Sequence, residues 1–397
     1  MKNKEVSSKL SMNILYLISC LKQGKGGHYY SLKTTADEMN KTNRVFIASI
    51  GTDVSPVFKN MQNYFPITTR FPTYESVRKI ISIVKENNID VIHSFDDNAD
   101  FFARITSNIT KVPALLTKCG GPIPKKYYPK TRTLVVFSLE DMHYFNKSRK
   151  HQRTNLLHIP NRVCATEQDQ IAIKELKKGI DPEATILLRI SRFSKLHKKS
   201  IMDSINIVKC LRKDGLKVSL LVIGTKDSDV YEEIIKQAPI YVKIVTDDKY
   251  TVNASRLINI ADVVVGTGRG AMEAAIQGCA LLAPVEGLSM PVLVTKDNIE
   301  TFLEYNFSSR TVVHGISLEA EYLRVKNILT NQKMLSNMKN FIRCYAEKHF
   351  NIFEVRDKYE TIYKECPPCE LNIIDSIIHY YYTSKPYLSK LIRRFKS

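Results

Sequence analysis

Short apolar runs alternate with amphipathic stretches along most of the chain. Before residue 160, the apolar runs predict strands at 12–19, 45–50, 90–93, 113–117, 133–137 and 155–159, and the amphipathic stretches predict helices from about 28, at 74–87, at 98–107 and from 139. After residue 182 the pattern restarts, with strands at 185–190, 217–223, 241–246, 262–265 and 280–283, and helices at 199–213, 228–237, 251–260 and after 268. This alternation predicts an α/β fold built from βαβ units around parallel sheets.

The pattern is interrupted once, at 160–182, by a segment rich in Glu, Gln, Asp and Lys. From about 318 onward, apolar residues recur every three or four positions, which predicts helices. We therefore expect an N-terminal Rossmann-like domain at 1–165, a second Rossmann-like domain at 166–340, and C-terminal helices with a basic tail at 341–397. Two doubly wound domains in succession predict a cleft, with ligands at the carboxyl ends of the strands.

Composition fits a globular protein, with 44% hydrophobic and 25% charged residues. No run reaches the roughly 18 apolar residues that a spanning helix needs. The run Met12–Cys20 is apolar but short, and a polar decapeptide precedes it, which favours a buried strand over a signal peptide. Eight cysteines without a disulfide framework predict a reducing, cytoplasmic location. Cys366 and Cys369 have redox or zinc spacing, but because no second pair accompanies them we favour a linker turn.

The net charge of +19 indicates an anionic partner. Nucleic acid is disfavoured because no helix-turn-helix, zinc-finger or RNA-stacking signature is present and tryptophan is missing. The basic residues gather at 385–396, where they are mixed with Tyr387, Leu388, Leu391, Ile392 and Phe395 just after Tyr380–Tyr382. An anionic membrane surface and a frayed basic tail both remain open for this segment.

A glycine-rich turn at 266–270 joins the apolar run Val263–Val265 to a helix that carries Glu273. Its glycines let the backbone approach a bulky anion, and the helix start adds N–H groups and a positive dipole end. We assign Thr267, Gly268, Arg269 and Gly270 to the diphosphate of a nucleotide. Glu273 lies about one turn into the helix, where it can bind ribose hydroxyls.

The same turn also fits a dinucleotide fingerprint, Gly266-x-Gly268-x-x-Ala271, with Glu286 near the expected distance. An NAD-dependent dehydrogenase is therefore an alternative. That fingerprint normally opens its domain, however, and here it follows three strands. We expect no cofactor and no metal.

A basic loop, Arg189–Ser200, connects the first strand of the second half to its helix. Cations are unfavourable at a helix start, which favours a functional role over solvated lysines. We assign Arg192, Lys198 and Lys199 to the donor diphosphate, with Arg192 and Lys199 stabilising the leaving phosphate as the bond breaks.

Strand ends in both halves carry further candidates. Gly26 and Gly27 follow the first strand, and Gly224 follows Ile223. We assign all three to binding of the nucleotide diphosphate compound, the donor, with an ordinary βα turn as the alternative. His93 ends a strand and is a candidate acid, base or substrate contact, with a buried, hydrogen-bonded histidine as the alternative. The acceptor is assigned to Cys119, Gly120, Gly121, Lys125 and Lys126, against a simple glycine turn and a solvated loop.

Taken together, these motifs resemble the GT-B glycosyltransferases of family 4, which build bacterial surface polysaccharides. The matching segments, in chain order, are Gly26-Gly27, Asp90-Val-Ile-His93, Ile159-Pro-Asn161, Arg192 with Lys198 or Lys199, and Gly268 with Glu273. Arg162 stands where the family has a glycine, Cys119 where it often has a histidine, and Val265 where it has a first glutamate that contacts the donor sugar. Arg269 is a candidate for part of the phosphate role.

The resemblance implies two Rossmann-like domains and transfer of a sugar from a UDP- or GDP-sugar, without a metal and with retention. The implied acceptor is a growing surface polysaccharide, of the capsule or lipopolysaccharide type, or a lipid-linked oligosaccharide at the inner face of the membrane. A nucleotide-sugar epimerase of the same fold and a non-catalytic polysaccharide-assembly partner remain alternatives.

Overall fold

The structure is a computed structural model that describes residues 11–21, 23–124, 127–226 and 229–395. The chain forms two compact units. The first unit contains the chain up to Phe137, Asp141–Ile159 and the part from Ile352 onward, and the second contains Ser138–Glu140 and Pro160–Asn351. The division differs from the expected boundaries at 165 and 340, because the C-terminal segment returns to the first unit instead of standing apart.

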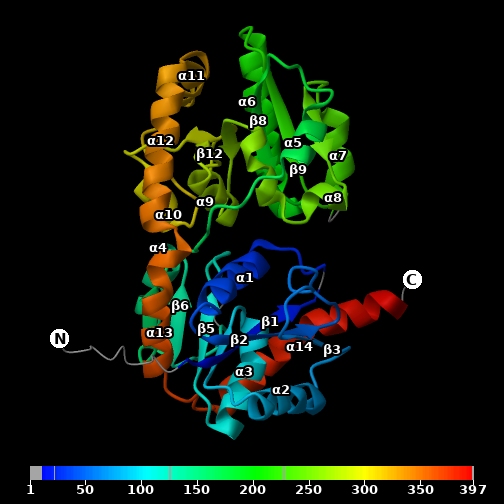
Figure 1. The fold of residues 1–397 in the computed structure, drawn as a ribbon, viewed down its shortest axis with the longest axis vertical. Helices are drawn as coiled ribbons and strands as arrows, with labels where there is room; N and C mark the ends of the chain where they lie inside the picture. Colours follow the sequence, from blue (N-terminus) through cyan, green and yellow to red (C-terminus); the bar gives the residue numbers. More distant parts are fainter. Residues whose placement is uncertain (1–10, 22, 125–126, 227–228, 396–397) are drawn as a thin grey trace, which may run out of the picture. The chain divides into compact units, whose positions relative to one another are not determined.

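The described part of the first unit contains a seven-stranded sheet in the order β3-β2-β1-β4-β5-β6-β7, and all of its neighbouring strands pair in parallel (Figure 1). Its strands are β1 Asn13–Cys20, β2 Arg44–Gly51, β3 Tyr64–Thr68, β4 Val91–Ser94, β5 Ala114–Lys118, β6 Thr133–Val136 and β7 Asn155–His158. The early helices are α1 Gly27–Met39, α2 Tyr74–Glu86, α3 Asp97–Thr110 and α4 Leu139–Lys147. The strand order reverses at β1 and β4, as in a doubly wound sheet.

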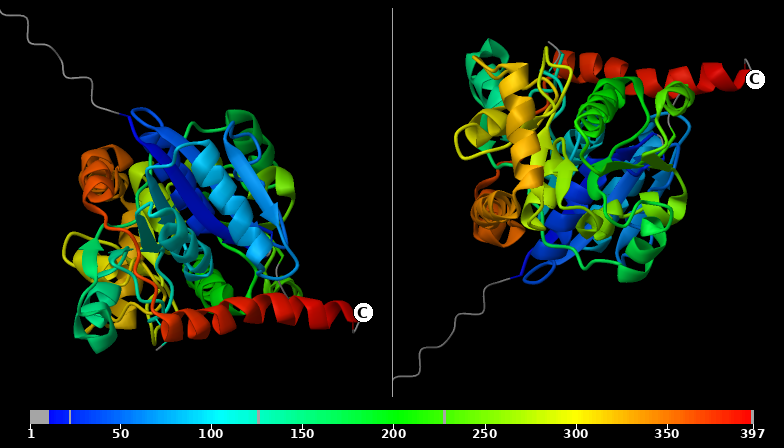
Figure 2. Two further views of the ribbon diagram at one scale, coloured as in Figure 1. Left: turned by 90° about the horizontal axis from the view of Figure 1, so that it is seen from below. Right: turned by 90° about the horizontal axis from the view of Figure 1, so that it is seen from above.

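Two helices from the end of the chain complete the first unit: α13, Arg356–Glu365, and α14, Ile373–Phe395. Helix α14 packs on α3 and extends past the sheet toward the C-terminus, as the two views in Figure 2 show. None of the helices in the described ranges has both the length and the apolar composition needed to cross a bilayer.

Within its described residues, the second unit has a six-stranded sheet in the order β10-β9-β8-β11-β12-β13. The strands are β8 Thr185–Ile190, β9 Val218–Ile223, β10 Val242–Val245, β11 Val263–Val265, β12 Ala280–Ala283 and β13 Val292–Leu293. Only the short edge strand β13 runs antiparallel to its neighbour there. The helices are α5 Gln170–Lys177, α6 Lys195–Lys213, α7 Val230–Gln237, α8 Asp248–Thr251, α9 Arg269–Ile276, α10 Ile299–Glu304, α11 Leu318–Thr330 and α12 Gln332–His349.

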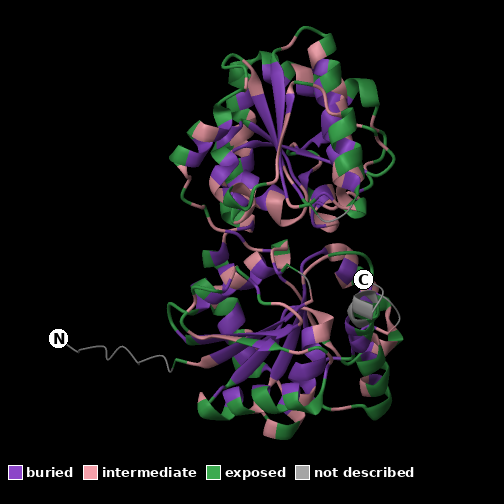
Figure 3. Cartoon of the chain, turned by 90° about the vertical axis from the view of Figure 1, so that its right-hand side faces the viewer, coloured by how far each residue is buried: buried purple, intermediate pink, exposed green. Residues whose placement is uncertain are grey.

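The strands are apolar because they are buried, which explains why the apolar runs of the sequence predicted them. In Figure 3 the strands of both units are buried, and the helices around them expose their outer sides. Leu187 and Leu188 are consecutive on β8, and they belong to separate hydrophobic clusters. Both faces of this sheet are therefore covered, which is why its strands are apolar throughout.

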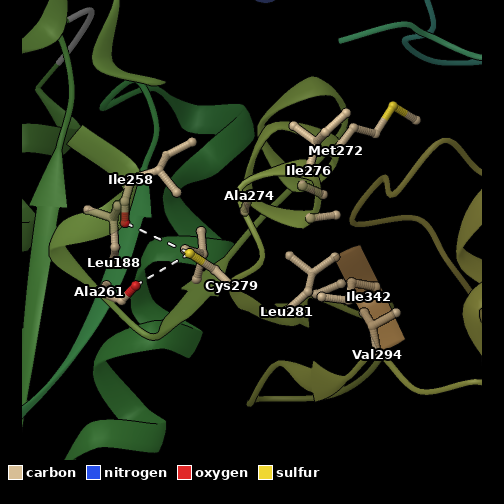
Figure 4. Close-up of a cluster of buried hydrophobic side chains, with 14 of the residues drawn as sticks. Leu188, Ile258, Ala261, Met272, Ala274, Ile276, Cys279, Leu281, Val294 and Ile342 are labelled. Atoms are coloured by element: carbon tan, nitrogen blue, oxygen red, sulfur yellow. Dashed lines mark hydrogen bonds between the residues drawn. The ribbon is translucent and has the colours of Figure 1, made fainter. Parts of the chain in front are cut away.

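Helix α9 is fixed by the core of the second unit (Figure 4). Met272, Ala274 and Ile276 belong to the same buried cluster as Leu281. Just after the helix, the Cys279 thiol donates to the carbonyl oxygens of Ile258, at 3.9 Å, and Ala261, at 3.4 Å. This packing holds the glycine-rich turn and the first turn of α9 in place.

Candidate functional site

The strongest candidate site lies at the carboxyl ends of β9, β8 and β11, which are neighbours in the sheet of the second unit; Figure 1 labels β8 and β9. Strand β8 pairs in parallel with β9 on one side and with β11 on the other. Their following loops carry the predicted residues Arg192, Gly224, Thr267 and Gly268. Parallel pairing therefore brings together three loops that are far apart in the sequence.

The three glycines of the turn before α9 serve different purposes. A Cβ on Gly266 would lie 2.5 Å from the Ala271 Cα, so this glycine permits close packing of strand and helix. Gly268 has φ +51° and caps the helix, in the region that favours glycine. A Cβ on Gly270 would meet nothing within 4 Å. The surface at Gly270 is open to a ligand, while Gly266 is structural.

Backbone amides of this turn already donate within the chain. The Gly268 N–H donates to the Phe307 carbonyl at 3.1 Å, the Gly270 N–H to the Thr267 carbonyl at 3.1 Å, and the Ala271 N–H to the Gly268 carbonyl at 3.1 Å. A diphosphate would have to displace these bonds to use those amides. Phosphate binding by the backbone of this turn therefore stays a prediction, and the side chains and the helix dipole can attract the anion without breaking these bonds.

Glu273 is oriented by a cation on its own helix. Arg269 Nε donates to Glu273 Oε1 at 2.7 Å, and Arg269 also donates to the Arg162 carbonyl at 2.7 Å. In the described part of the chain, no protein group bonds to the second carboxylate oxygen, Oε2. Since the Glu273 side chain is 17% exposed, this oxygen can accept hydroxyl donors from a ligand.

Arg189, at the end of β8, is a residue that the sequence analysis did not single out. Its side chain is 1% exposed and donates to the Val265 carbonyl at 3.0 Å, the Ser200 hydroxyl at 2.8 Å and the Thr267 hydroxyl at 3.3 Å. Burial lowers the pKa of Arg189 to about 10, so the guanidinium remains charged at neutral pH. The sequence feature that could have identified Arg189 is its charge inside the otherwise apolar run Thr185–Ile190.

No carboxylate in the described ranges forms an ion pair with Arg189, and its Nε has no hydrogen-bond partner there. The carboxylate that acts on it, Asp203, is paired with Lys199 instead. Arg189 therefore places a positive charge without an ion-pair partner among the described residues 3.3 Å from the Thr267 hydroxyl. Buried charges are costly unless they are balanced, which makes this location favourable for an anion.

The three predicted cations of the basic loop differ in availability. Lys198 forms an ion pair with Glu233 on α7, and Lys199 pairs with Asp203 at 2.6 Å and also donates to the Leu288 carbonyl. Arg192 is exposed, and no carboxylate among the described residues pairs with it. Of the three, Arg192 can meet an anion without first breaking an ion pair.

Two neighbouring positions have structural explanations. A Cβ on Gly224 would lie 1.7 Å from the Ser191 carbonyl oxygen, so the close approach of two backbones requires glycine there. This is the βα-turn alternative, and donor contact by Gly224 stays a prediction. Val265 is fully buried in β11 and its carbonyl accepts from Arg189, so no side-chain carboxylate is available where the resembling family has its first glutamate.

His93 is a core residue of the first unit. It is fully buried, with Nδ1 2.9 Å from the Tyr363 hydroxyl and Nε2 2.7 Å from the Thr117 hydroxyl. Burial lowers its pKa to about 3. Both ring nitrogens are occupied and the side chain is fully buried, which gives catalysis by His93 no support, and that role stays a prediction. The alternative of a buried, hydrogen-bonded histidine is confirmed.

The other first-unit candidates lie in turns. Gly26 caps α1 and Gly27 begins it. The Cys119 thiol donates to the Phe95 carbonyl at 3.3 Å and burial raises its pKa, so it is a neutral thiol. Gly120 and Gly121 have φ +74° and +90°, as the glycine-turn alternative expects. Lys125 and Lys126 lie outside the described residues. Donor and acceptor contacts by this group stay predictions.

Cys366 and Cys369 are buried thiols that share one acceptor. Both donate to the Ala114 carbonyl, at 3.5 Å and 3.6 Å. Burial raises their pKa values to about 11 and about 12, which disfavours the thiolate that zinc or redox chemistry requires. In the described ranges, no group of three or more His, Cys, Asp or Glu side chains is placed to hold a metal ion.

Comparisons with solved structures extend over 89% of the chain. HepE of Anabaena, solved in complex with UDP-glucose, is 15% identical and matches over 100% of its own chain with a TM-score of 0.64. WaaG, a glycosyltransferase involved in lipopolysaccharide biosynthesis, is 13% identical over 100% of its chain with a TM-score of 0.56. The UDP-GlcNAc 2-epimerase of Neisseria meningitidis, solved with UDP-GlcNAc, is 11% identical over 100% of its chain with a TM-score of 0.54.

No protein-family model matches the sequence, and no curated protein matches it. Sequence identities of 11–15% establish the fold, and the chemistry has to be argued from the residues of the site. The two Rossmann-like units and these structural neighbours together show that the chain has the GT-B fold.

Proposed function

We propose that the protein is a glycosyltransferase of the family 4-like GT-B type, which transfers a sugar from a nucleotide-diphosphate sugar. The observation that carries this proposal is the arrangement around α9. Glu273 has one oxygen fixed by Arg269 and one available, and it lies about one helical turn after Gly268, while the buried guanidinium of Arg189 donates to Thr267, the residue before Gly268. A carboxylate for a ribose and cations for a diphosphate therefore lie on one edge of one sheet.

Each group has a defined role in this proposal. Glu273 Oε2 accepts hydrogen bonds from ribose hydroxyls. Arg189 and the positive end of α9 attract the diphosphate, and Arg192 stabilises the charge that develops on the leaving phosphate. Lys199 assists Arg192 by leaving its ion pair with Asp203 and binding the phosphate. Lys198, now paired with Glu233, is the alternative residue for this role. These cations perform the charge neutralisation that a metal supplies in other transferases, so we propose that no metal is required.

The donor is most simply a UDP-sugar, with a GDP-sugar as the second choice. HepE, which shares the fold, has been solved with UDP-glucose. For the acceptor we propose a growing surface polysaccharide, of the capsule or lipopolysaccharide type, or a lipid-linked oligosaccharide. The likeness to WaaG and the net charge of +19 support that choice. We further propose retention of anomeric configuration and a cytoplasmic location, peripheral at the inner face of the membrane.

A thermal-shift panel tests the donor site directly. The purified chain is heated with UDP-, GDP-, ADP- and CMP-sugars and with NAD. We expect stabilisation by a UDP- or GDP-sugar, and loss of that shift in Arg192→Ala and in Glu273→Gln. Lys236→Ala, an exposed change on α7, is the matched control and should keep the shift. An unchanged shift in both site variants would refute the assignment, and a shift with NAD alone would favour a dehydrogenase.

The epimerase alternative has a specific basis, since the Neisseria enzyme shares the fold. It predicts a changed sugar on the intact nucleotide without any acceptor. The glycosyltransferase predicts release of the nucleoside diphosphate that increases when acceptor is added. Chromatography of the reaction products with and without an oligosaccharide acceptor separates the two. Donor binding without either product would indicate a non-catalytic assembly partner.

A further inference from the structure

Helix α14 presents an apolar face that the described residues of its unit leave uncovered. Ile373, Ile374, Ile377, Tyr381, Leu388 and Ile392 are 75%, 71%, 64%, 56%, 44% and 55% exposed. At ~100° per residue, these six positions fall within an arc of ~100° on one side of the helix. We call this surface the α14 face. Single exposed apolar residues are common, but an aligned row of this length marks an interaction site.

The opposite side of α14 is fastened to the first unit by buried charges. Asp375 accepts from Arg104 at 2.9 Å and pairs with Lys150 at 2.7 Å. His379 accepts from Arg104 at 2.6 Å, and its other ring nitrogen lies 2.6 Å from the Asp97 carbonyl oxygen. Rotating the helix to bury its apolar face would separate these groups, and breaking a buried ion pair is strongly destabilising. The α14 face is therefore held outward.

Charge and aromatic content identify what this face fits. The one acidic residue in α14 is Asp375, which is buried, so the exposed side carries no carboxylate. Lys385 is exposed, and its ammonium lies 4.5 Å from the ring centres of both Tyr381 and Tyr382. Isoleucines beside tyrosines and a lysine are typical of helices that lie at a membrane interface with their cations at the headgroups.

We propose that α14 docks the protein on an anionic lipid bilayer, with the α14 face inserted and Lys385 at the headgroup level. A second copy of the chain fits less well, because a chain with net charge +19 repels itself and the α14 face offers no acid to meet a cation. A spanning orientation is not available to the described helices. The inference deepens the proposed peripheral location, and so rests on the proposed function.

Vesicle sedimentation with the full chain tests the proposal. We expect binding to vesicles that contain phosphatidylglycerol, and much weaker binding to pure phosphatidylcholine. In the double variant Ile374→Ser with Ile377→Ser, binding should fall by about a hundredfold, since burial of each isoleucine contributes about tenfold. Lys385→Gln should weaken binding to anionic vesicles about fivefold.

The matched control is Ile171→Ser with Ile240→Ser, which removes two isoleucines of the second unit that are more exposed than the α14 pair and should leave binding unchanged. Equal binding by wild type and the α14 variant would overturn the proposal, as would equal binding to neutral vesicles. A wild-type dimer that the α14 variant loses, without vesicle binding, would assign the face to a second copy instead. The α14 variant should keep its thermal shift with the donor, so vesicle binding and donor binding can fail separately.

Discussion

His379, the buried histidine of α14, gives the sharpest test of the structure, because its protonation state is dictated by geometry. Nδ1 of His379 lies 2.6 Å from a guanidinium nitrogen of Arg104, and arginine can only donate. Nδ1 must therefore be unprotonated, and Nε2 carries the hydrogen that it donates to the Asp97 carbonyl. Burial first, and the adjacent Arg104 second, lower the pKa of His379 to about 3.

The sign and size of the effect follow from linkage. In the unfolded chain a histidine has a pKa of about 6.5, so below that pH the unfolded state takes up a proton that the folded state refuses. The contribution of His379 to stability is therefore complete above pH ~6.5 and is lost progressively as the pH falls toward the folded value of about 3. Between pH ~7.5 and pH ~5 the loss amounts to about 2 kcal/mol in free energy of unfolding.

The substitution His379→Gln isolates the contribution of His379 to the pH dependence of stability. The glutamine amide keeps an acceptor for Arg104 and a donor for the Asp97 carbonyl, but it does not titrate. We expect wild type to lose about 2 kcal/mol more than the variant between pH ~7.5 and pH ~5. Urea unfolding at both pH values measures the difference, and hydrogen exchange of peptides from α14 assigns it to the first unit.

Other groups titrate in the same range, so the comparison between variants carries the test. Burial raises the pKa of Asp100, which acts in the opposite direction, and lowers the pKa of His151 to about 4, which acts in the same direction. Both cancel between wild type and His379→Gln. His314→Gln, an exposed histidine in the second unit, should behave like wild type. If His379→Gln and wild type lose the same free energy, His379 is not held neutral and the described anchoring is wrong.

Three further outcomes follow from the geometry. Gly224→Ala should cost about 3 kcal/mol or more, because its Cβ would fall 1.7 Å from a backbone oxygen, whereas Gly270→Ala has open space and should change the melting temperature little. His93→Gln should leave the pH profile of sugar transfer unchanged, since a buried histidine with both nitrogens bonded takes no part in proton transfer; an altered profile would restore its catalytic role. Arg189→Met should weaken donor binding about tenfold in calorimetry, with partial recovery in Arg189→Lys, and unchanged affinity would remove Arg189 from the site.

The fold was accessible from the sequence where strands are buried on both faces. Such strands appear as continuous apolar runs, as in Leu220–Ile223. Strand β3, Tyr64–Thr68, was not predicted, because it is an edge strand with an internal proline and only one buried residue. The helix expected at 251–260 is mostly a 3₁₀ segment, Ala254–Ile260, entered through Asn253 at φ +54°. Local periodicity carries no information about such edges and left-handed residues.

The site was accessible only as far as local spacing reaches. The five-residue interval from Gly268 to Glu273 places a carboxylate over the start of a helix, and the structure has that arrangement. Spacing in the sequence does not reveal which distant residues a side chain contacts. His93 stands at a strand end, where a functional residue is expected, but its partner Tyr363 is 270 residues away. Lys198 is likewise neutralised by Glu233 on the next helix.

These non-local partners also decide which cations of the site matter. Lys198 and Lys199 each already have a carboxylate, so a diphosphate that approached either would compete with an existing ion pair. Arg189 and Arg192 have no such competitor among the described residues, and one of them is buried where its field is poorly screened. A diphosphate bound beside Thr267 would supply the missing negative charge. The affinity of the site should therefore depend more on these two arginines than on the lysines, although the sequence presents all four as one basic cluster.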